Sequence, residues 1–136
     1  MKFNQLCDKI IALAEHDNDI ELLWLYGSYA KGTAHKNSDI DLAVTFTTRQ
    51  EDALERRLRP ELLAMEWQRK LKLKEGDLSI LDMSNAKIPL AMSVLTTGKL
   101  LLSKNISRQL QEQQRIMSIW EIDYLYHYKN KQAIYG

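Results

Sequence analysis

Two aspartates, Asp39 and Asp41, stand at the start of an apolar run, residues 40–46, that has the composition of a buried strand. Because side chains alternate along a strand, both carboxylates project to one side, with their Cα atoms about 6.6 Å apart. Two uncompensated carboxylates at this spacing repel each other, and burial at a sheet end increases the repulsion. A divalent cation removes the conflict, and Mg²⁺ prefers carboxylate oxygens and is commonly shared with substrate phosphates. The pair therefore predicts a magnesium site.

A Gly-Ser pair, Gly27 and Ser28, ends the preceding apolar run, residues 20–26. Gly27 lets the backbone turn sharply and approach a ligand closely. We expect Ser28 to cap a short helix whose free N–H groups attract an anion, and its hydroxyl can also donate to a phosphate. Lys31 would add a positive charge, with a merely solvated loop lysine as the alternative. A phosphate-binding turn beside a metal-binding pair predicts a nucleoside triphosphate site.

A third carboxylate should come from a neighbouring strand, and two aspartates compete for this role. Asp77 opens the third predicted strand, at the position that matches Asp39 if the strands meet at one end of the sheet. Asp82 lies at the other end of that strand, and the odd spacing turns it to the opposite face. We favour Asp77, which could complete the metal site and accept a proton from an attacking hydroxyl.

The elements that position these residues follow from apolar spacing and from turn signals. Thr48 and Glu51 match a capping box, so a helix should start near Arg49 and run to about Lys74, with a kink or break at Pro60. The pattern predicts one α/β (α+β) domain over residues 1–136, in which helices flank a small mixed sheet of about four strands. The other expected helices cover 3–16, 89–97 and about 106–129, and the strands cover 20–26, 40–46, 76–83 and 99–103.

The length, composition, net charge and cysteine count of the chain exclude several classes of protein. The 136 residues suffice for one compact domain, and 45% of them are apolar and 27% charged, as in soluble globular proteins. The net charge of +1 gives no bulk attraction to nucleic acid, so direct nucleic-acid binding is not expected. One cysteine excludes a multi-cysteine zinc site within the chain. With no secretory signal and no apolar segment of membrane-spanning length, we expect a cytoplasmic protein.

Gly27-Ser28, ten further residues and then Asp39-Ile40-Asp41 form the pattern G-S-x10-D-x-D. This pattern resembles the nucleotidyltransferase superfamily related to DNA polymerase β. The surrounding "GSYAKGTAHKNSDIDL" is similar to the minimal nucleotidyltransferases (MNT), small proteins encoded beside HEPN-domain toxins. The later "GDLSILDMSNAKIPLAMSVLTTGKLLL" resembles the third-carboxylate strand, the next helix and the closing strand of that group. The resemblance covers about residues 20–103.

The resemblance implies a polymerase β-like fold and an antitoxin that transfers AMP from ATP to a tyrosine of a HEPN ribonuclease toxin, with which it would form a hetero-oligomer. It implies that Ser28 and its turn hold the triphosphate, and that Asp39 and Asp41 hold two Mg²⁺ ions with Asp77 completing the catalytic set. Two alternatives stay open. The protein could neutralise its toxin by binding alone, or it could act on small molecules, as aminoglycoside nucleotidyltransferases do.

Two helices carry a second interpretation beside the structural one. The C-terminal helix has an apolar face, and tyrosines follow it at Tyr126, Tyr128 and Tyr135. Aromatic side chains favour protein interfaces, so this segment either contacts a partner or packs on its own sheet. The segment 49–74 is basic on balance, and a solvated face is favoured there over contact with RNA or an acidic partner.

Overall fold

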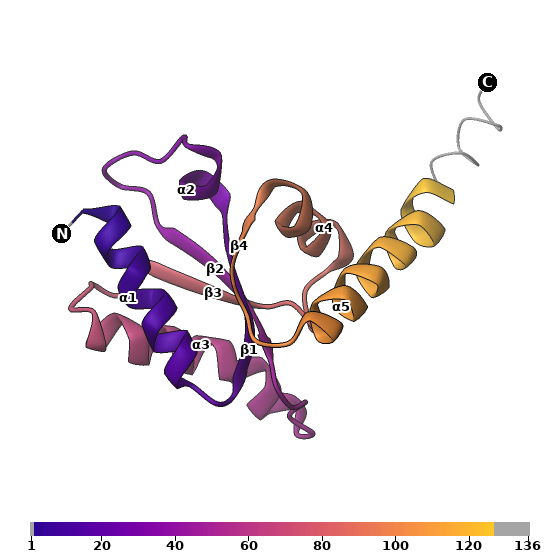
Figure 1. The fold of residues 1–136 in the computed structure, drawn as a ribbon, viewed down its shortest axis with the longest axis horizontal. Helices are drawn as coiled ribbons and strands as arrows, with labels where there is room; N and C mark the ends of the chain where they lie inside the picture. The colour runs from indigo at the N-terminus through magenta and orange to yellow at the C-terminus, as the bar shows by residue number, and fades with distance from the viewer. Residues whose placement is uncertain (1, 127–136) are drawn as a thin grey trace.

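A computed structural model of the chain describes residues 2–126 (Figure 1). Its centre is one four-stranded sheet with the spatial order β3-β2-β1-β4. β1 pairs antiparallel with both β2 and β4, whereas β2 and β3 run parallel. The expected mixed sheet is confirmed, and its strands are β1 (Ile20–Tyr26), β2 (Ile40–Phe46), β3 (Leu78–Asp82) and β4 (Lys99–Ser103).

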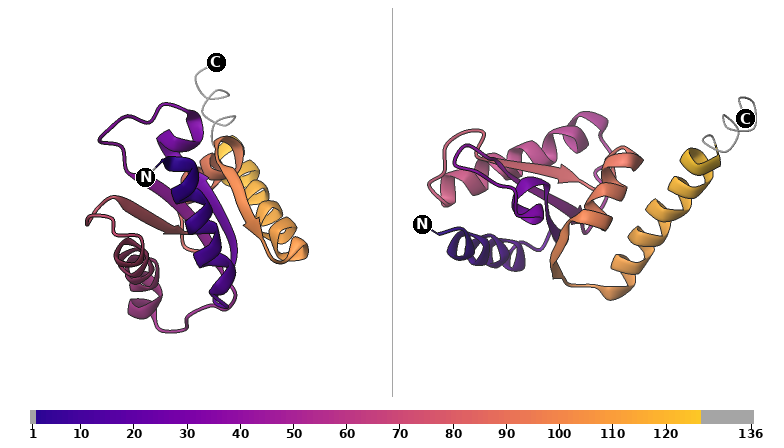
Figure 2. Two further views of the ribbon diagram at one scale, coloured as in Figure 1. Left: turned by 60° about the vertical axis from the view of Figure 1, so that its left-hand side comes forward. Right: turned by 90° about the horizontal axis from the view of Figure 1, so that it is seen from above.

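Helices cover both faces of the sheet, as the two views of Figure 2 show. One face carries α1 (Phe3–His16), which precedes β1 in the sequence, and α3 (Ala53–Lys70), which follows β2. The other face carries α4 (Ile88–Thr97) and α5 (Ile106–Ile119), which continues into the π-helical turn η1 (Trp120–Leu125). The short helix α2 (Gly27–Lys31) follows β1 at one end of the sheet. Within residues 2–126, no helix is long and apolar enough to cross a membrane.

The strand β1 feeds two separate apolar cores because its side chains alternate between the faces. Leu23 and Leu25 pack with α1 and α3, and Trp67 of α3 is almost fully buried there. Leu22 and Trp24 pack with α4 and α5 on the opposite face. Helices therefore pack on both faces of the sheet and fix the strand end that carries Gly27, Asp39 and Asp41.

The predicted boundaries of α3 are wrong at both ends. The helix starts at Ala53, where the Asp52 side chain accepts a hydrogen bond from the Glu55 N–H at 2.9 Å, so Asp52 replaces the expected Thr48 cap. Pro60 lies inside the helix without ending it, so the predicted break is absent, whereas the alternative of a kink stays a prediction. The helix stops at Lys70 rather than near Lys74, because Lys72 adopts a left-handed φ of 57° that reverses the chain.

The remaining boundaries shift by one or two residues, and the C-terminal prediction is only partly covered. β3 begins at Leu78 rather than at Gly76, and α4 begins at Ile88, one residue before Pro89. The last predicted helix, from about 106 to 129, is regular only to Ile119 and then widens into η1. The predicted contacts of Tyr128 and Tyr135 lie outside the described residues.

Candidate active site

Asp39 and Asp41 lie where β2 begins, and the sheet holds them from both sides. Asp41 pairs with Tyr26 at the end of β1, and the neighbouring Ile40 pairs with Leu78 at the start of β3. Burial raises the pKa of the Asp41 carboxyl, and the negative charge of Asp39 raises this pKa further. The expected repulsion between Asp39 and Asp41 is therefore present, and the location of Asp41 between two strands accounts for its burial.

Gly27 lies directly against Asp41. Its backbone has a φ of +70°, in the left-handed region that favours glycine. A Cβ atom added at Gly27 would lie 3.1 Å from the Asp41 carboxyl carbon and would collide with Oδ2. The glycine therefore serves both the turn out of β1 and the close approach of that turn to the carboxylate.

Ser28 lies inside α2 and does not cap it, which corrects the expected role. The capping position is Tyr26, whose side chain makes no capping hydrogen bond. The Ser28 carbonyl accepts a hydrogen bond from the Thr33 N–H at 3.0 Å, and Gly32 ends the helix with a φ of +74°. The first N–H groups of a helix have no intrahelical acceptor, so this turn presents donors beside the carboxylates.

Lys31 is exposed in the last turn of α2. Among residues 2–126 it has no carboxylate within 4 Å, so its ammonium group is not neutralised by an ion pair in that part of the chain. The following loop is organised by its own side chains, since the Ser38 hydroxyl accepts from the His35 N–H at 2.8 Å. His35 Nδ1 accepts from the Asn37 N–H at 3.2 Å, which turns this histidine toward its own loop.

Asp77 and Asp82 lie at opposite ends of β3. The Ile40 N–H donates to the Asp77 carbonyl at 2.9 Å, so Asp77 is the neighbour of Asp39. Asp82 pairs in register with Val44, about 16 Å further along the strand. The Asp82 carboxylate is buried and accepts hydrogen bonds from the Ser84 N–H at 3.0 Å and from Asn85 at 3.2 Å. Of the two candidates, only Asp77 lies at the strand end that holds Asp39 and Asp41.

The family model described as "Polymerase beta, Nucleotidyltransferase" matches residues 8–107, which include both sides of this strand end. The chain belongs to the polymerase β nucleotidyltransferase family. A curated protein adenylyltransferase, MntA of Shewanella oneidensis, is 37% identical over 94 residues, which make up 68% of this chain and 61% of that protein. The match therefore spans about three fifths of that relative's length.

Solved structures agree with this nucleotidyltransferase assignment. A crystal structure described as a toxin–antitoxin with AMP-PNP has a TM-score of 0.72 and 26% identity, covering 96% of this chain and 98% of the other. A second structure, described as tri-AMPylated Shewanella oneidensis HEPN toxin in complex with MNT antitoxin, has a TM-score of 0.66, covers 97% of this chain and 98% of the other, and is 22% identical. At this lower identity, the second likeness shows the fold alone.

The carboxylates of the nucleotidyltransferase suit a divalent cation, but they do not form a closed site. Asp39 and Asp41 provide oxygen donors whose mutual repulsion a cation would relieve. One oxygen of the Asp77 carboxylate, Oδ2, accepts a hydrogen bond from the Lys74 N–H at 2.8 Å. Within residues 2–126, no three acidic, histidine or cysteine side chains converge as metal ligands. A third ligand from Asp77 would require its side chain to move closer to Asp39 and Asp41.

Two further residues of the nucleotidyltransferase support this end of the sheet, and the sequence reasoning missed both. Gln68 of α3 is buried, and its Oε1 accepts from the Gly76 N–H at 3.0 Å and from the Leu78 N–H at 3.1 Å. It therefore clamps the segment that contains Asp77. Burial raises the pKa of the Tyr26 hydroxyl, and the adjacent Asp41 raises it further. The position of Tyr26 directly before Gly27 could have indicated its role. No sequence pattern distinguishes Gln68 from the other polar residues of its helix.

Proposed function

We propose that this chain transfers AMP from ATP to a tyrosine hydroxyl of a HEPN-type toxin encoded beside it, and thereby neutralises the toxin. The observation that carries the proposal is the contact between the Gly27 turn and Asp41, with Asp39 raising the pKa of Asp41. Family membership and the name of the relative MntA support the same chemistry. The similar structure described as a toxin–antitoxin with AMP-PNP supports ATP as the donor.

Each residue receives a role from its location. The N–H groups of the α2 turn, the Ser28 hydroxyl and the Lys31 ammonium group bind the triphosphate. Asp39 and Asp41 would hold Mg²⁺, two ions in this proposal, and the bound metal would neutralise phosphate charge and activate the attacking oxygen. The tyrosine oxygen forms a bond to the α-phosphorus while the bond to the pyrophosphate oxygen breaks. The hydroxyl proton passes to a carboxylate base, a role that we assign to Asp77.

The toxin would dock on the end of the molecule formed by α5 and η1. Exposed apolar side chains are concentrated there, with Met117, Ile122 and Leu125 exposed by 47%, 67% and 43%. Trp120 and Tyr124 stack beside them with their ring centroids 5.1 Å apart. A patch of this composition is typical of a protein interface. We therefore assign the C-terminal helix to contact with the toxin.

The test is transfer of label from α-labelled ATP to the purified product of the adjacent gene, in the presence of Mg²⁺. We expect the parent to label the toxin, and Asp39→Asn and Asp41→Asn each to lose at least about 99% of the rate, because metal-binding groups act in the transition state. Asp8→Asn is the matched control, since Asp8 is an exposed residue of α1 far from β2 in the chain. Equal labelling by parent and aspartate variants would refute the proposal.

Neutralisation by binding alone is the second candidate, and the orientation of Asp77 favours it. The Lys74 N–H occupies Asp77 Oδ2, and within residues 2–126 no three acidic, histidine or cysteine side chains converge on a metal site. A cell-growth assay separates the two functions. If Asp39→Asn still protects cells from the toxin, binding suffices; if protection is lost while the complex still forms, catalysis is required.

A further inference from the structure

An arginine-rich cavity lies at the end of the sheet opposite to Asp39 and Asp41. Its volume is about 300 Å³, and it is built from the end of β2 with the following loop, from α3, from the turn after β3 and from α5. Phe46 and Asp82, the last residues of their strands, are part of its wall. Five arginines line it: Arg49, Arg56, Arg59, Arg108 and Arg115.

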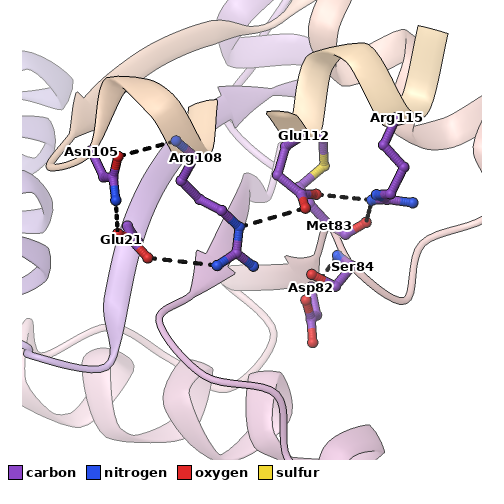
Figure 3. A network of polar contacts seen from close by, with 8 residues as sticks. All are labelled: Glu21, Asp82, Met83, Ser84, Asn105, Arg108, Glu112 and Arg115. Carbon is purple, nitrogen blue, oxygen red and sulfur yellow. Dashed lines mark hydrogen bonds and ion pairs between the residues drawn. The ribbon is translucent and has the colours of Figure 1, made fainter. Parts of the chain in front are cut away.

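Positive charge exceeds negative charge in this cavity. Its acidic lining residues are Asp82 and Glu112, and Glu21 pairs with Arg108 at 3.7 Å beside the cavity, so the five guanidinium groups leave an excess of two positive charges. Glu112 is buried between two arginines, with contacts of 2.9 Å to Arg115 and 3.6 Å to Arg108 (Figure 3). Desolvation by burial raises the pKa of Asp82, which lowers the negative charge that this carboxyl can supply.

Three of the arginines have no carboxylate partner in the part of the chain that the structure describes. No acidic oxygen of residues 2–126 lies within 4 Å of a guanidinium nitrogen of Arg49, Arg56 or Arg59. Two of them are nevertheless held in place by backbone carbonyls. Arg56 donates to the Gln50 carbonyl at 3.2 Å, and Arg59 donates to the Thr48 carbonyl at 2.8 Å.

The arginines are arranged before any ligand arrives. The guanidinium carbon of Arg59 lies 3.9 Å from the centre of the Phe46 ring, and Arg115 donates to the Met83 carbonyl at 3.3 Å. Ordered guanidinium groups lose little side-chain entropy when they bind an oxyanion, and their planar donors match phosphate oxygens. A surface of solvated arginines would not require this set of carbonyl and ring contacts.

We propose that this cavity binds the phosphate or pyrophosphate group of a small molecule, at a site separate from the transfer site. The volume is at the lower limit for ligand pockets, about 300–1,000 Å³, which favours a small oxyanion over a peptide or a nucleic acid. A doubly negative phosphate would also balance this excess of two positive charges. The phosphate group can be a free ion or part of a nucleotide, because the arginines would bind the same phosphate oxygens in both.

The experiment is a calorimetric titration of the full chain in EDTA, with phosphate, pyrophosphate and AMP in separate runs. We expect saturable binding of pyrophosphate, and a loss of affinity of roughly 10- to 100-fold in Arg56→Gln, since hydrogen bonds to charged groups contribute about 1.5–3 kcal/mol. Arg56→Lys should recover only part of the affinity, because it keeps the charge but loses the planar donors. Stronger binding of AMP than of free phosphate would identify a nucleotide as the source.

Two controls locate the binding. Arg69→Gln changes an exposed arginine of the same helix that does not line the cavity, and it should bind like the parent. Amide shifts of ¹⁵N-labelled protein on addition of pyrophosphate should appear at Phe46, Ser84 and Asn85, with few changes at Gly27 and Ser28. If Arg56→Gln should not fold, Arg49→Gln provides the same test at an exposed position. Unchanged affinity in the folded variants, shifts confined to the Gly27 turn, or binding of oligonucleotides alone would overturn the proposal.

Discussion

Asp41 is a carboxyl group in a location that disfavours its ionised form. It is partly buried between two strands, and the charge of Asp39 lies two residues away on the same side. Both effects act on the ligand-free protein and would be reversed by a bound cation. A group of this kind contributes to function at the expense of stability, which is common at active sites.

The first prediction concerns pH and Asp41→Asn. The Asp41 carboxyl binds its proton more tightly in the folded protein than in the unfolded chain. The free energy of unfolding therefore decreases as the pH rises from 3.8 through the raised pKa of the folded state. In EDTA at neutral pH, we expect Asp41→Asn to be more stable than the parent by up to about 0.5 kcal/mol, because solvent screens a partly exposed group. Urea denaturation at several pH values measures the difference. Parallel stability curves for the two proteins would contradict it.

The second prediction compares two glycines with similar backbones. Gly27→Ala places a Cβ against Asp41, and Gly32→Ala places one in open space, although their φ angles are +70° and +74°. Both changes should destabilise the fold by about 1–2 kcal/mol through left-handed strain. Only Gly27→Ala should also abolish transfer, since it displaces the Asp41 carboxylate. Thermal denaturation and the labelling assay measure the two effects, and equal losses of activity would show that strain alone is responsible.

Residue types at short spacing were the most predictable part of this site. The sequence predicted that the Gly27 turn and the acidic pair belong to one site, because a phosphate-binding turn and two carboxylates flank the same loop. The orientation of Asp77 could not be predicted, since its hydrogen bond to the Lys74 N–H depends on how the chain turns after α3. The role of Ser28 as a cap was wrong because the helix begins at Gly27, which moves the capping position two residues back to Tyr26.

At the scale of elements, α3 links the two ends of the sheet. It starts near the arginine cavity with Arg56 and Arg59, and its later turns carry Gln68 toward the segment before β3. This follows from the parallel pairing of β2 and β3, because the connection must return along the whole sheet. The helix therefore affects both proposed sites while contributing a side chain directly to only one.

The third prediction tests the clamp made by Gln68. Gln68→Met preserves size but removes the acceptor of the Gly76 and Leu78 N–H groups, and one unsatisfied buried N–H costs about 1–3 kcal/mol. We expect that loss of stability together with a fall in the transfer rate, as the Asp77 segment becomes less ordered. Gln68→Glu retains an acceptor oxygen and should restore the rate. The kcat and KM values from the labelling assay separate positioning from ATP binding.

If kcat stays at the parent value in a folded Gln68→Met protein, the clamp has a structural role only. Hydrogen exchange at the Leu78 amide provides an independent readout, because this amide should exchange faster in the methionine variant and at the parent rate in the glutamate variant.

The elements were predictable in type and order, and less so at their ends. Apolar runs such as 20–26 and 40–46 were assigned with the correct bounds, since both are almost completely buried. The start of α3 was misplaced because Thr48 and Glu51 match a capping box, whereas Asp52 provides the actual cap. Strand order and the mixture of parallel and antiparallel pairs depend on long-range packing, which no local pattern contains.

At the scale of the whole molecule, the two proposed sites lie at opposite ends of the sheet, and α5 runs from the arginine cavity, which it helps to line, to η1. The transfer site lies at the start of β2, the arginine cavity lies at its end, and α5 with η1 extends away from the sheet (Figure 2). The cavity was not predictable from the sequence. Its arginines come from segments about 50 residues apart, and the basic segment 49–74 was interpreted as a solvated face.

The fourth prediction concerns the exposed face of η1. Ile122→Asp should weaken association with the toxin at least tenfold, because a charge would replace the most exposed apolar side chain of this face, at 67%. Leu62→Asp is the matched control, since Leu62 is exposed by 60% on α3, on the other side of the sheet. Surface plasmon resonance with immobilised toxin compares the two variants. Parent-like affinity of Ile122→Asp would exclude this face from the interface.

The repulsion between Asp39 and Asp41 also bears on how long each copy of the protein survives in a cell. A ligand that binds only the folded chain raises the ratio of folded to unfolded protein, and this increase grows with the ligand concentration divided by its dissociation constant. Less of the protein is then unfolded and open to proteases. Copies carrying metal and ATP would outlast empty copies, because the empty pair works against folding. The abundance of the protein would then follow the energy supply, and starvation would shorten its half-life without any dedicated degradation signal.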